Sequence, residues 1–156
     1  MNNNVYYFAQ GLPGFEDLRR FRLVEEEGVP FARLISVEEE RIGFILIRPA
    51  LLFPDYGVEV DDKSAETLKL NPAANEAGSA NTNLDEKQNI NVDIWAIVTM
   101  NKEDFAQNTV NLRAPILLNN IHKVGIQLIL MDEKYLTKQP LIKDKSFSQE
   151  QEGAVG

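Results

Sequence analysis

The chain has 156 residues, no cysteine and a net charge of −8, from 24 acidic side chains against 16 lysines and arginines. The lack of cysteine excludes disulfides, thiol catalysis and cysteine metal sites. Because nucleic acids are bound mainly through basic side chains that release counterions, this charge argues against direct RNA or DNA binding and suits solubility or a basic protein partner.

The first predicted elements are a strand and a turn. Val5 to Ala9 is rich in aromatic and β-branched residues, which favour strands. The motif Gly11-Leu-Pro-Gly-Phe-Glu16 follows, and its Pro13-Gly14 pair is the signature of a type II turn, because the glycine position needs a positive φ. We expect the apolar residues on either side of this pair to plug one end of the core.

Three further strands are expected before residue 50, at 21–24, 31–35 and 41–48. Acidic turns at 25–28 and 38–40 separate them. Both faces of the third strand are apolar, which predicts a central position in the sheet.

The segment from Ala50 to Tyr56 is strongly apolar, yet two prolines bracket it, which predicts an irregular loop that lies over the barrel. A strand is expected to resume over 56–60. Asp62 is the predicted N-cap of a short helix that runs to Leu70 and packs through Leu68.

The stretch 71–91 breaks the composition of the chain, because it has few large apolar residues and many Asn, Ala, Gly and Ser. A structureless loop of about 20 residues is uncommon in a compact domain unless it is functional or disordered, so we expect a mobile surface insertion. From Ile90 to Met100 the residues alternate with period two, which predicts a long strand. We expect its Trp95 to pack in the core or at a barrel end, and a place on a binding face is the alternative.

The stretch from Asn108 to Met131 is expected to organise the fold. Its second apolar run, Val124 to Met131, alternates with period two and has one wholly apolar face, which indicates a strand. Asparagines cluster at the ends of the apolar runs, where their side chains can bind backbone groups and shape turns. We therefore predict two strands and a turn at the centre of an all-β domain.

Together these elements indicate a mostly β, small single-domain antiparallel β-barrel-like fold with one or two short helices. We expect the domain to span 1–143, with 71–91 as a flexible insertion, and 144–156 to be a flexible tail. The sequence has no signal-peptide pattern and no apolar run of about 18 residues, so a cytoplasmic protein that does not cross a membrane is expected.

No pattern predicts an enzyme, a metal site or a cofactor. The single histidine, His122, falls in the predicted turn 119–123, where a solvent-facing position is expected, and a zinc site would need carboxylates for most of its ligands. The chain has no nucleophile elbow, Walker loop or GxGxxG motif. Its carboxylates lie in charged turns, where nothing predicts the desolvation that tunes a catalytic pKa.

A protein-binding surface is the remaining candidate site. Phe53 and Tyr56 offer anchor-sized side chains on the apolar loop, and the alternative is that they cap the core. The acidic residues expected to orient a basic partner are Glu38, Glu39, Glu40, Asp55, Glu59 and Asp61.

Three motifs occur in a characteristic order: Gly11-Leu-Pro-Gly-Phe-Glu16, the Phe-Pro-Asp-Tyr within 49–56, and Asn111-Leu-Arg-Ala-Pro-Ile116 followed by Asn119. With Gln127 and Tyr135, they resemble the flagellar assembly factor FliW family over most of 6–141, and 71–91 departs from the pattern. The residues that match family motifs, for structure or binding, are Gly11, Pro13, Gly14, Phe15, Asn111, Pro115 and Asn119.

The resemblance implies a small non-enzymatic protein with two protein partners. Proteins of this family bind the carbon storage regulator CsrA, a basic RNA-binding dimer that represses flagellin translation, and they also bind flagellin, which competes with CsrA. The resemblance implies that CsrA is antagonised allosterically, away from its RNA surface. We expect Phe53 and Tyr56 to anchor a helical segment of a partner, and the free protein to be a monomer.

Two alternatives come from other classes of protein. A small β-barrel can hold one small ligand or a non-covalent cofactor such as flavin, although the chain has no phosphate-cradling loop. A purely structural subunit is the second alternative, and it should self-associate.

Overall fold

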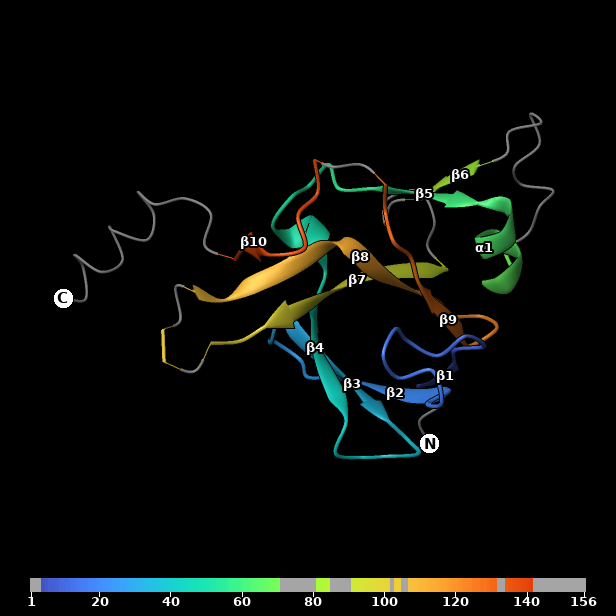
Figure 1. Ribbon diagram of the computed structural model, residues 1–156, viewed down its shortest axis with the longest axis horizontal. Coiled ribbons are helices and arrows are strands. Elements are labelled where there is room, and N and C mark those ends of the chain that lie inside the picture. The colour runs from blue at the N-terminus through green and yellow to red at the C-terminus, as the bar shows by residue number, and fades with distance from the viewer. Residues whose placement is uncertain are drawn as a thin grey trace.

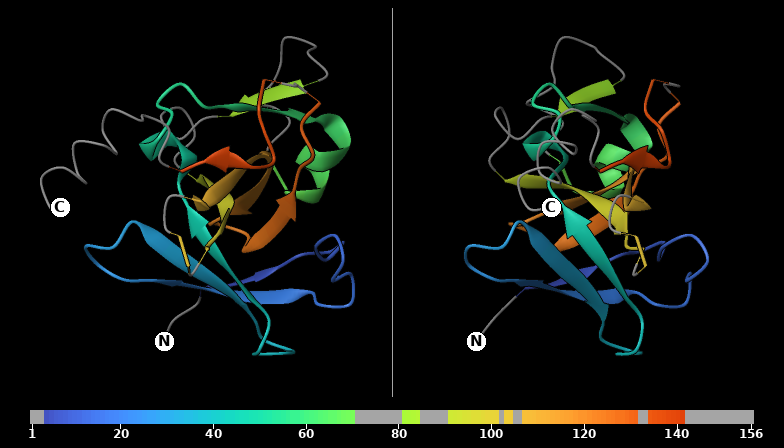
Figure 2. Two further views of the ribbon diagram at one scale, coloured as in Figure 1. Left: turned by 60° about the vertical axis from the view of Figure 1, so that its left-hand side comes forward. Right: turned by 90° about the vertical axis from the view of Figure 1, so that its left-hand side faces the viewer.

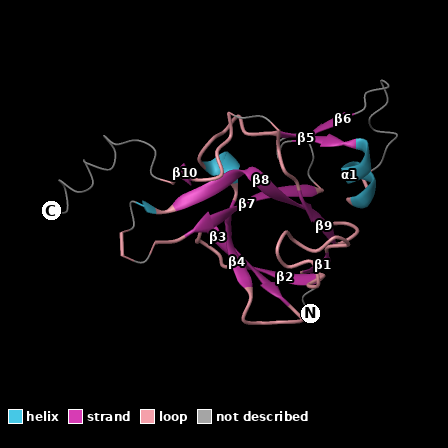
Figure 3. Cartoon of the chain, in the orientation of Figure 1, coloured by secondary structure: helices cyan, strands magenta, loops and turns pink. Residues whose placement is uncertain are grey.

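The structure of the chain is a computed structural model (Figure 1), which describes residues 4–70, 81–84, 91–101, 103–104, 107–131 and 134–141. Strands dominate these residues (Figure 3). The elements, in chain order, are β1 (Val5–Tyr7), β2 (Arg20–Glu25), β3 (Phe31–Ser36), β4 (Gly43–Ile47), the 3₁₀ helix η1 (Pro49–Leu51), β5 (Val58–Asp61), α1 (Asp62–Thr67), β6 (Asn81–Leu84), β7 (Val92–Thr99), β8 (Thr109–Asn119), β9 (Val124–Gln127) and β10 (Gln139–Pro140).

Seven of these strands form a closed barrel. Neighbouring strands follow the order β8-β7-β4-β3-β2-β1-β9, and β9 pairs back onto β8. Each pairing is antiparallel except that of β1 with β9, which run parallel and meet at Tyr7 and Val124. β10 pairs antiparallel with the start of β8, and β5 and β6 form a separate two-stranded sheet. The predicted β-barrel-like class is confirmed.

The strands β7, β8 and β9 are covered on both of their faces. Figure 2 shows β1 to β4 on one side of them and β5, β6 and α1 on the other. Inside the barrel, Phe8, Phe21 and Trp95 are each at most 2% exposed. On the outer side, Ile94 and Leu117 are also at most 2% exposed and belong to a second core. This double burial is why these strands appear as apolar runs in the sequence, and it places Trp95 in the core as expected.

A large bulge interrupts β8 opposite β7. Trp95 pairs with Ile116 and Ile97 pairs with Asn111, so the four residues 112–115 stand against a single residue of β7. Asn111 stabilises this bulge, because its Oδ1 accepts the N–H groups of Arg113 and Ala114, each at 3.0 Å. A bulge of this kind bends the strand and frees backbone groups for other partners.

The freed backbone groups of the bulge bind the segment that follows β9. The Pro115 carbonyl accepts the N–H of Leu128 at 3.0 Å, and the Arg113 carbonyl accepts the N–H of Leu130 at 2.8 Å. The N–H of Leu112 donates to the Leu136 carbonyl at 2.9 Å. The bulge therefore holds Leu128, Leu130 and Leu136 against β8.

Two local predictions differ from the structure. The N-cap of α1 is Asp61 rather than Asp62, because the Asp61 carboxylate accepts the N–H of Ser64 at 2.7 Å. The helix also ends at Thr67, and Lys69 takes a left-handed φ of 60°, which prevents the helix from continuing to Leu70.

Part of the predicted insertion is a strand. Residues 81–84 form β6, in which Asn81 pairs with Asp61 and Leu84 pairs with Val58 of β5. The predicted insertion otherwise lies outside the described residues except for Asn91, and so does the predicted tail, 144–156. Among the described residues, no helix is long and apolar enough to cross a membrane.

Candidate partner-binding site

The irregular segment that follows β4 is held by its own backbone. In η1 and just after it, the Pro49 carbonyl accepts the N–H groups of Leu52 at 3.0 Å and Phe53 at 2.8 Å. A second turn closes where the N–H of Tyr56 donates to the Phe53 carbonyl at 2.8 Å. Pro49 lies in the first turn of η1, where its fixed φ suits the helix. These turns leave Leu51 on the surface with 61% of its area exposed.

Tyr56 belongs to the core rather than to the surface. It is 4% exposed, and its ring centroid lies 4.7 Å from that of Tyr135. Its hydroxyl donates to the Leu112 carbonyl in the β8 bulge at 2.6 Å. Burial raises the pKa of this hydroxyl above its ordinary value, and the neighbouring Tyr135 adds to the effect. Tyr56 therefore fastens the segment to β8, which differs from the predicted anchor role, because an anchor must reach a partner.

Phe53 is intermediate between the two roles. Its side chain is partly buried and packs against the outer core, as those of Leu52 and Tyr135 also do. Along this segment Leu51 is exposed, Phe53 is partly exposed and Tyr56 is buried.

Exposed carboxylates follow this segment along the chain. Asp55 is exposed in the turn before β5, and in β5 the exposed residues Glu59 and Asp61 alternate with the buried residues Val58 and Val60. Hydrogen bonds from Ser64 lower the pKa of Asp61. One continuous stretch of the chain, 51–61, therefore exposes both an apolar side chain, Leu51, and the carboxylates of Asp55, Glu59 and Asp61.

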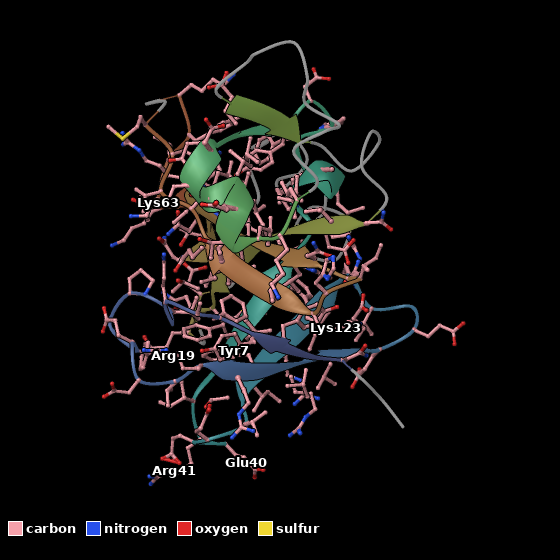
Figure 4. The ribbon with its side chains drawn as sticks, turned by 90° about the vertical axis from the view of Figure 1, so that its right-hand side faces the viewer. Tyr7, Arg19, Glu40, Arg41, Lys63 and Lys123 are labelled. Carbon is pink, nitrogen blue, oxygen red and sulfur yellow. The ribbon has the colours of Figure 1, made fainter. Side chains whose placement is uncertain are left out.

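The acidic turn 38–40 lies at the other end of the molecule. Figure 1 shows the β3–β4 turn at the bottom and η1 near the top, and Figure 4 places Glu40 and Arg41 at the bottom with Lys63 far above them. Glu38 forms an ion pair with Arg20 at 3.1 Å, and Glu39 forms one with Arg41. The turn 38–40 and the segment with Phe53 and Tyr56 therefore do not lie side by side.

The ion pair between Glu38 and Arg20 is largely open to solvent. Burial of the carboxylate would raise its pKa, but the backbone and guanidinium hydrogen bonds of Arg20 outweigh that effect and lower the pKa. Arg20 and Glu38 remain 57% and 30% exposed, so the pair contributes little to stability.

The glycine-rich family motif closes one end of the barrel. The Phe15 N–H donates to the Leu12 carbonyl at 2.7 Å, and Gly14 has a φ of 86°, as the predicted type II turn requires. Leu12 is 2% exposed, and the Phe15 ring packs edge-on against Phe44 with centroids 5.7 Å apart. Gly11 has a φ of 63°, and a Cβ there would lie 2.7 Å from the backbone of the loop. Gly11, Leu12 and Phe15 therefore pack at this end of the barrel, whereas Pro13, Gly14 and Glu16 are exposed.

The asparagine that ends β8 joins three parts of the chain. Asn119 is 4% exposed, and its Nδ2 donates to the carbonyl of Leu68, just after α1, at 2.8 Å. Its Oδ1 accepts the N–H groups of Ile121 at 2.9 Å and His122 at 3.1 Å. Like Asn111, this residue satisfies buried backbone groups, so both motif asparagines act in the fold.

A polar network that the sequence did not reveal closes the opposite end of the barrel. The Tyr6 hydroxyl donates to Asn120 Oδ1 at 2.6 Å, and Asn120 Nδ2 donates to Asp93 at 3.1 Å. The Arg48 guanidinium lies 3.3 Å from Asp93 and 4.3 Å from the centroid of the Trp95 ring. No local motif marks this network, because its members come from β1, β7, the end of β4 and the β8–β9 turn.

This network also has an electrostatic signature. Glu25, at the end of β2, lies 3.7 Å from the Arg48 guanidinium. Burial first, and then the charges of Asp93 and Glu25, raise the pKa of Tyr6 to about 12. Arg48 is shared by two carboxylates, so the cluster is suited to holding strands together.

The described residues contain no arrangement suited to metal binding. No group of three or more His, Asp or Glu side chains among them could hold an ion. His122 is exposed in the β8–β9 turn, as expected.

The chain was compared with protein families and solved structures. The family model described as FliW protein matches residues 1–141. A flagellar assembly factor FliW of Caldanaerobacter subterraneus subsp. tengcongensis is 32% identical over 143 residues, which cover 90% of this chain and 84% of that protein. A FliW of Bacillus licheniformis is 36% identical over 135 residues, which cover 86% and 82%.

A solved structure agrees with these matches. The crystal structure of a flagellar assembly factor FliW superposes with a TM-score of 0.75 at 32% identity, and it covers 93% of this chain and 90% of that one. The motifs that close the barrel and shape the β8 bulge thus occur in a chain that matches FliW proteins over most of its length. The chain belongs to the FliW family of flagellar assembly factors.

Proposed function

We propose that this chain is a non-enzymatic, cytoplasmic assembly factor that binds and antagonises CsrA and also binds flagellin. Flagellin competes with CsrA in this proposal, so flagellin that accumulates before export releases CsrA to repress further translation. Membership in the FliW family supports the flagellar role. The net charge of −8 supports a basic protein partner over RNA itself.

The exposed Leu51 is the single observation that carries a binding site in this proposal. A leucine that is 61% exposed on a segment fixed by four backbone hydrogen bonds loses little conformational freedom when a partner covers it. Asp55 and Glu59, which are exposed and follow in sequence, can pair with basic side chains around the apolar contact. This combination fits one amphipathic, basic helix of the partner.

The residues predicted from the sequence take different parts in this proposal. Phe53 lies at the edge of the contact and Tyr56 supports it from below. Glu38, Glu39 and Glu40 are too far away to touch the same helix and add only to the negative field that steers a basic partner. Antagonism of CsrA then acts through this contact, away from the RNA surface of CsrA.

The direct test is calorimetric titration of the protein into CsrA from the same organism, repeated with flagellin already bound. Saturable binding that flagellin abolishes is the expected result. Binding that persists in excess flagellin would remove the competition from the proposal, and no binding to either protein would overturn the proposal.

Two variants distinguish a residue that contacts CsrA from a residue that only stabilises the binding segment. Leu51→Ala should weaken CsrA binding by about tenfold, the size expected for an interface anchor, and leave the melting temperature within about 1 °C of wild type. The matched variant Tyr56→Phe should bind CsrA normally and lose about 1–2 kcal/mol of stability, because the Leu112 carbonyl loses its buried donor. If Leu51→Ala binds like wild type, the contact lies elsewhere.

The ligand-binding alternative is less well supported by the barrel itself. Its interior holds Phe8, Phe21 and Trp95 in close contact, and the Phe8 and Phe21 ring centroids are 5.3 Å apart. A thermal-shift screen with flavins and nucleotides tests this alternative, and a saturable rise in melting temperature would revive it.

A further inference from the structure

The residues that follow β9, 128–131, continue along β8 and present one open backbone edge. The N–H groups of Leu128 and Leu130 point towards β8, where they donate to carbonyls of the bulge at 3.0 and 2.8 Å. Backbone groups of successive residues in an extended strand point to opposite sides. The N–H and C=O groups of Ile129, between them, therefore point away from β8.

No described residue forms a hydrogen bond on that outer side. The parallel contact of β1 with β9 is limited to Tyr7 and Val124, after which β1 leaves the strand. Within the described parts of the chain, the backbone groups of Ile129 and Met131 make no hydrogen bond. Their side chains are 61% and 86% exposed. Backbone donors and acceptors and two apolar side chains are thus presented together along one edge.

The sequence of this edge has none of the features that usually protect an open strand. Natural edges are blunted by charged side chains, proline, bulges or a covering segment. From Val124 to Met131 the chain is VGIQLILM, with no charge and no proline. Leu128 and Leu130 keep the strand extended through their bonds to β8, so the edge is also pre-ordered. An apolar edge of this kind is suited to receiving another strand.

We infer that the edge from Gln127 to Met131 is a docking site for an extended, basic segment of a partner protein, which adds to it as a β-strand. Charge selects this occupant over a second copy of the chain, because two molecules of net charge −8 repel each other and a cationic segment is attracted. Alternate apolar residues of the added strand cover Ile129 and Met131. This inference is independent of the function proposed above, since it uses neither Leu51 nor its carboxylates.

The test uses a synthetic seven-residue probe, the acetylated and amidated peptide KVTVTVK, and ¹⁵N-labelled full-length protein. The peptide should bind saturably and slow hydrogen exchange at the Ile129 amide, because that group becomes a donor to the added strand. The matched acidic peptide EVTVTVE should bind at least about fivefold more weakly. A KVTVTVK peptide that is N-methylated at alternate residues should lose most of its affinity, because it cannot complete the ladder.

Two substitutions of Ile129 distinguish the contribution of its backbone N–H to peptide binding from that of its side chain. Ile129→Pro removes an N–H that β8 does not use, so the fold should persist while affinity for KVTVTVK falls about tenfold or more. Ile129→Thr keeps the N–H and should stay within about threefold of wild type. Circular dichroism checks folding, and exchange protection in the wild-type protein gives a second readout if Ile129→Pro does not fold.

Several results would overturn the inference. They are the absence of KVTVTVK binding at millimolar peptide, binding without protection of the Ile129 amide, and equal affinity for the basic and acidic peptides. A dimer in sedimentation that Ile129→Pro dissociates would assign the edge to a second copy instead.

Discussion

The two ends of the barrel are closed by different chemistry. One end is plugged by Leu12 and Phe15 from a single tight turn, with Phe15 packed against Phe44. The other end is closed by a polar network in which Tyr6, Arg48 and Asp93 come from three separate parts of the chain. The apolar plug depends on backbone conformation and shape, whereas the polar end depends on matched donors, acceptors and charges. The two ends should therefore respond differently to mutation and to pH.

The largest effect is expected at the apolar end, for Gly11→Ala. The new Cβ would lie 2.7 Å from Glu16 Cα, and Gly11 already has a left-handed φ of 63°, so both the contact and the conformation oppose a side chain. We expect a loss of about 3 kcal/mol or more, which lowers the melting temperature by about 6–12 °C.

Gly14→Ala is the matched control for this loss. Gly14 also has a positive φ, but no atom lies within 4 Å of the position of its Cβ. It should lose only about 1 kcal/mol, the cost of the conformation alone. Equal losses for the two variants in thermal melts would show that the close packing of Gly11 against the loop is unimportant.

An intermediate effect is expected at the polar end, for Arg48→Met. The methionine retains much of the aliphatic volume but leaves Asp93 without its guanidinium and Trp95 without its cation. Because Arg48 is 29% exposed, part of the lost interaction is replaced by water, and we expect a loss of about 1–2 kcal/mol in urea unfolding.

Arg41→Met tests whether an ion pair as such explains that loss. Arg41 also pairs with a glutamate, but its side chain is 88% exposed. This variant should change stability by less than about 0.5 kcal/mol. A similar loss of stability in Arg48→Met and Arg41→Met would mean that partial burial does not strengthen the ion pairs of Arg48.

At the two ends of the barrel, a smaller effect than that of Arg48→Met is expected for Tyr6→Phe, which removes only the hydroxyl that donates to Asn120. We expect a loss of about 1 kcal/mol at neutral pH. The pKa of Tyr6 is raised from its ordinary value of 10.0 to about 12, so folding favours the protonated form. That contribution is fully present below pH 10 and is lost as the pH rises through about 12.

This pH dependence can be measured at the phenolate absorbance band. Ionisation of Tyr6 near pH 12 should be present in the wild-type protein and absent in Tyr6→Phe, and the stability difference between the two should shrink over the same range. If Tyr6 ionises near pH 10 in the folded protein, it is not held in the closed network. No corresponding change is expected for variants of the apolar end.

Much of this fold could be predicted from the order of residues along the chain. The alternation over Val124 to Met131 and the apolar runs of β7 and β8 indicated central strands, and both faces of β7, β8 and β9 are buried. The strand β9 ends at Gln127, however, and Ile129 and Met131 beyond it are exposed. The Pro13-Gly14 pair indicated its turn, because the positive φ of a type II turn is a local requirement. These features rest on interactions between near neighbours or on a simple division of apolar and polar faces, which a sequence displays directly.

Other features were decided only by tertiary structure. Tyr56 was predicted to meet a partner, but the β8 bulge places the Leu112 carbonyl where it accepts the Tyr56 hydroxyl, and this contact spans 56 residues of sequence. The acids of the turn 38–40 were expected to orient the same partner, and closure of the barrel carries this turn to the end of the molecule away from Phe53 and Tyr56. Burial and distance of this kind depend on how strands pair across the whole chain.

The polar end and the open edge that follows β9 also depend on long-range strand pairing. No local motif links Arg48, Asp93 and Asn120, and they form a network only because β4 and β8 end, and β7 begins, at the same side of the barrel. The apolar run at 124–131 indicated a strand, but only the pairing of β8 with its bulge decided which backbone groups remain free. The sequence by itself determined which segments are strands and which faces are apolar, because those depend on local periodicity. The partners of each strand, and with them the surfaces left for other proteins, were determined by long-range hydrogen bonding.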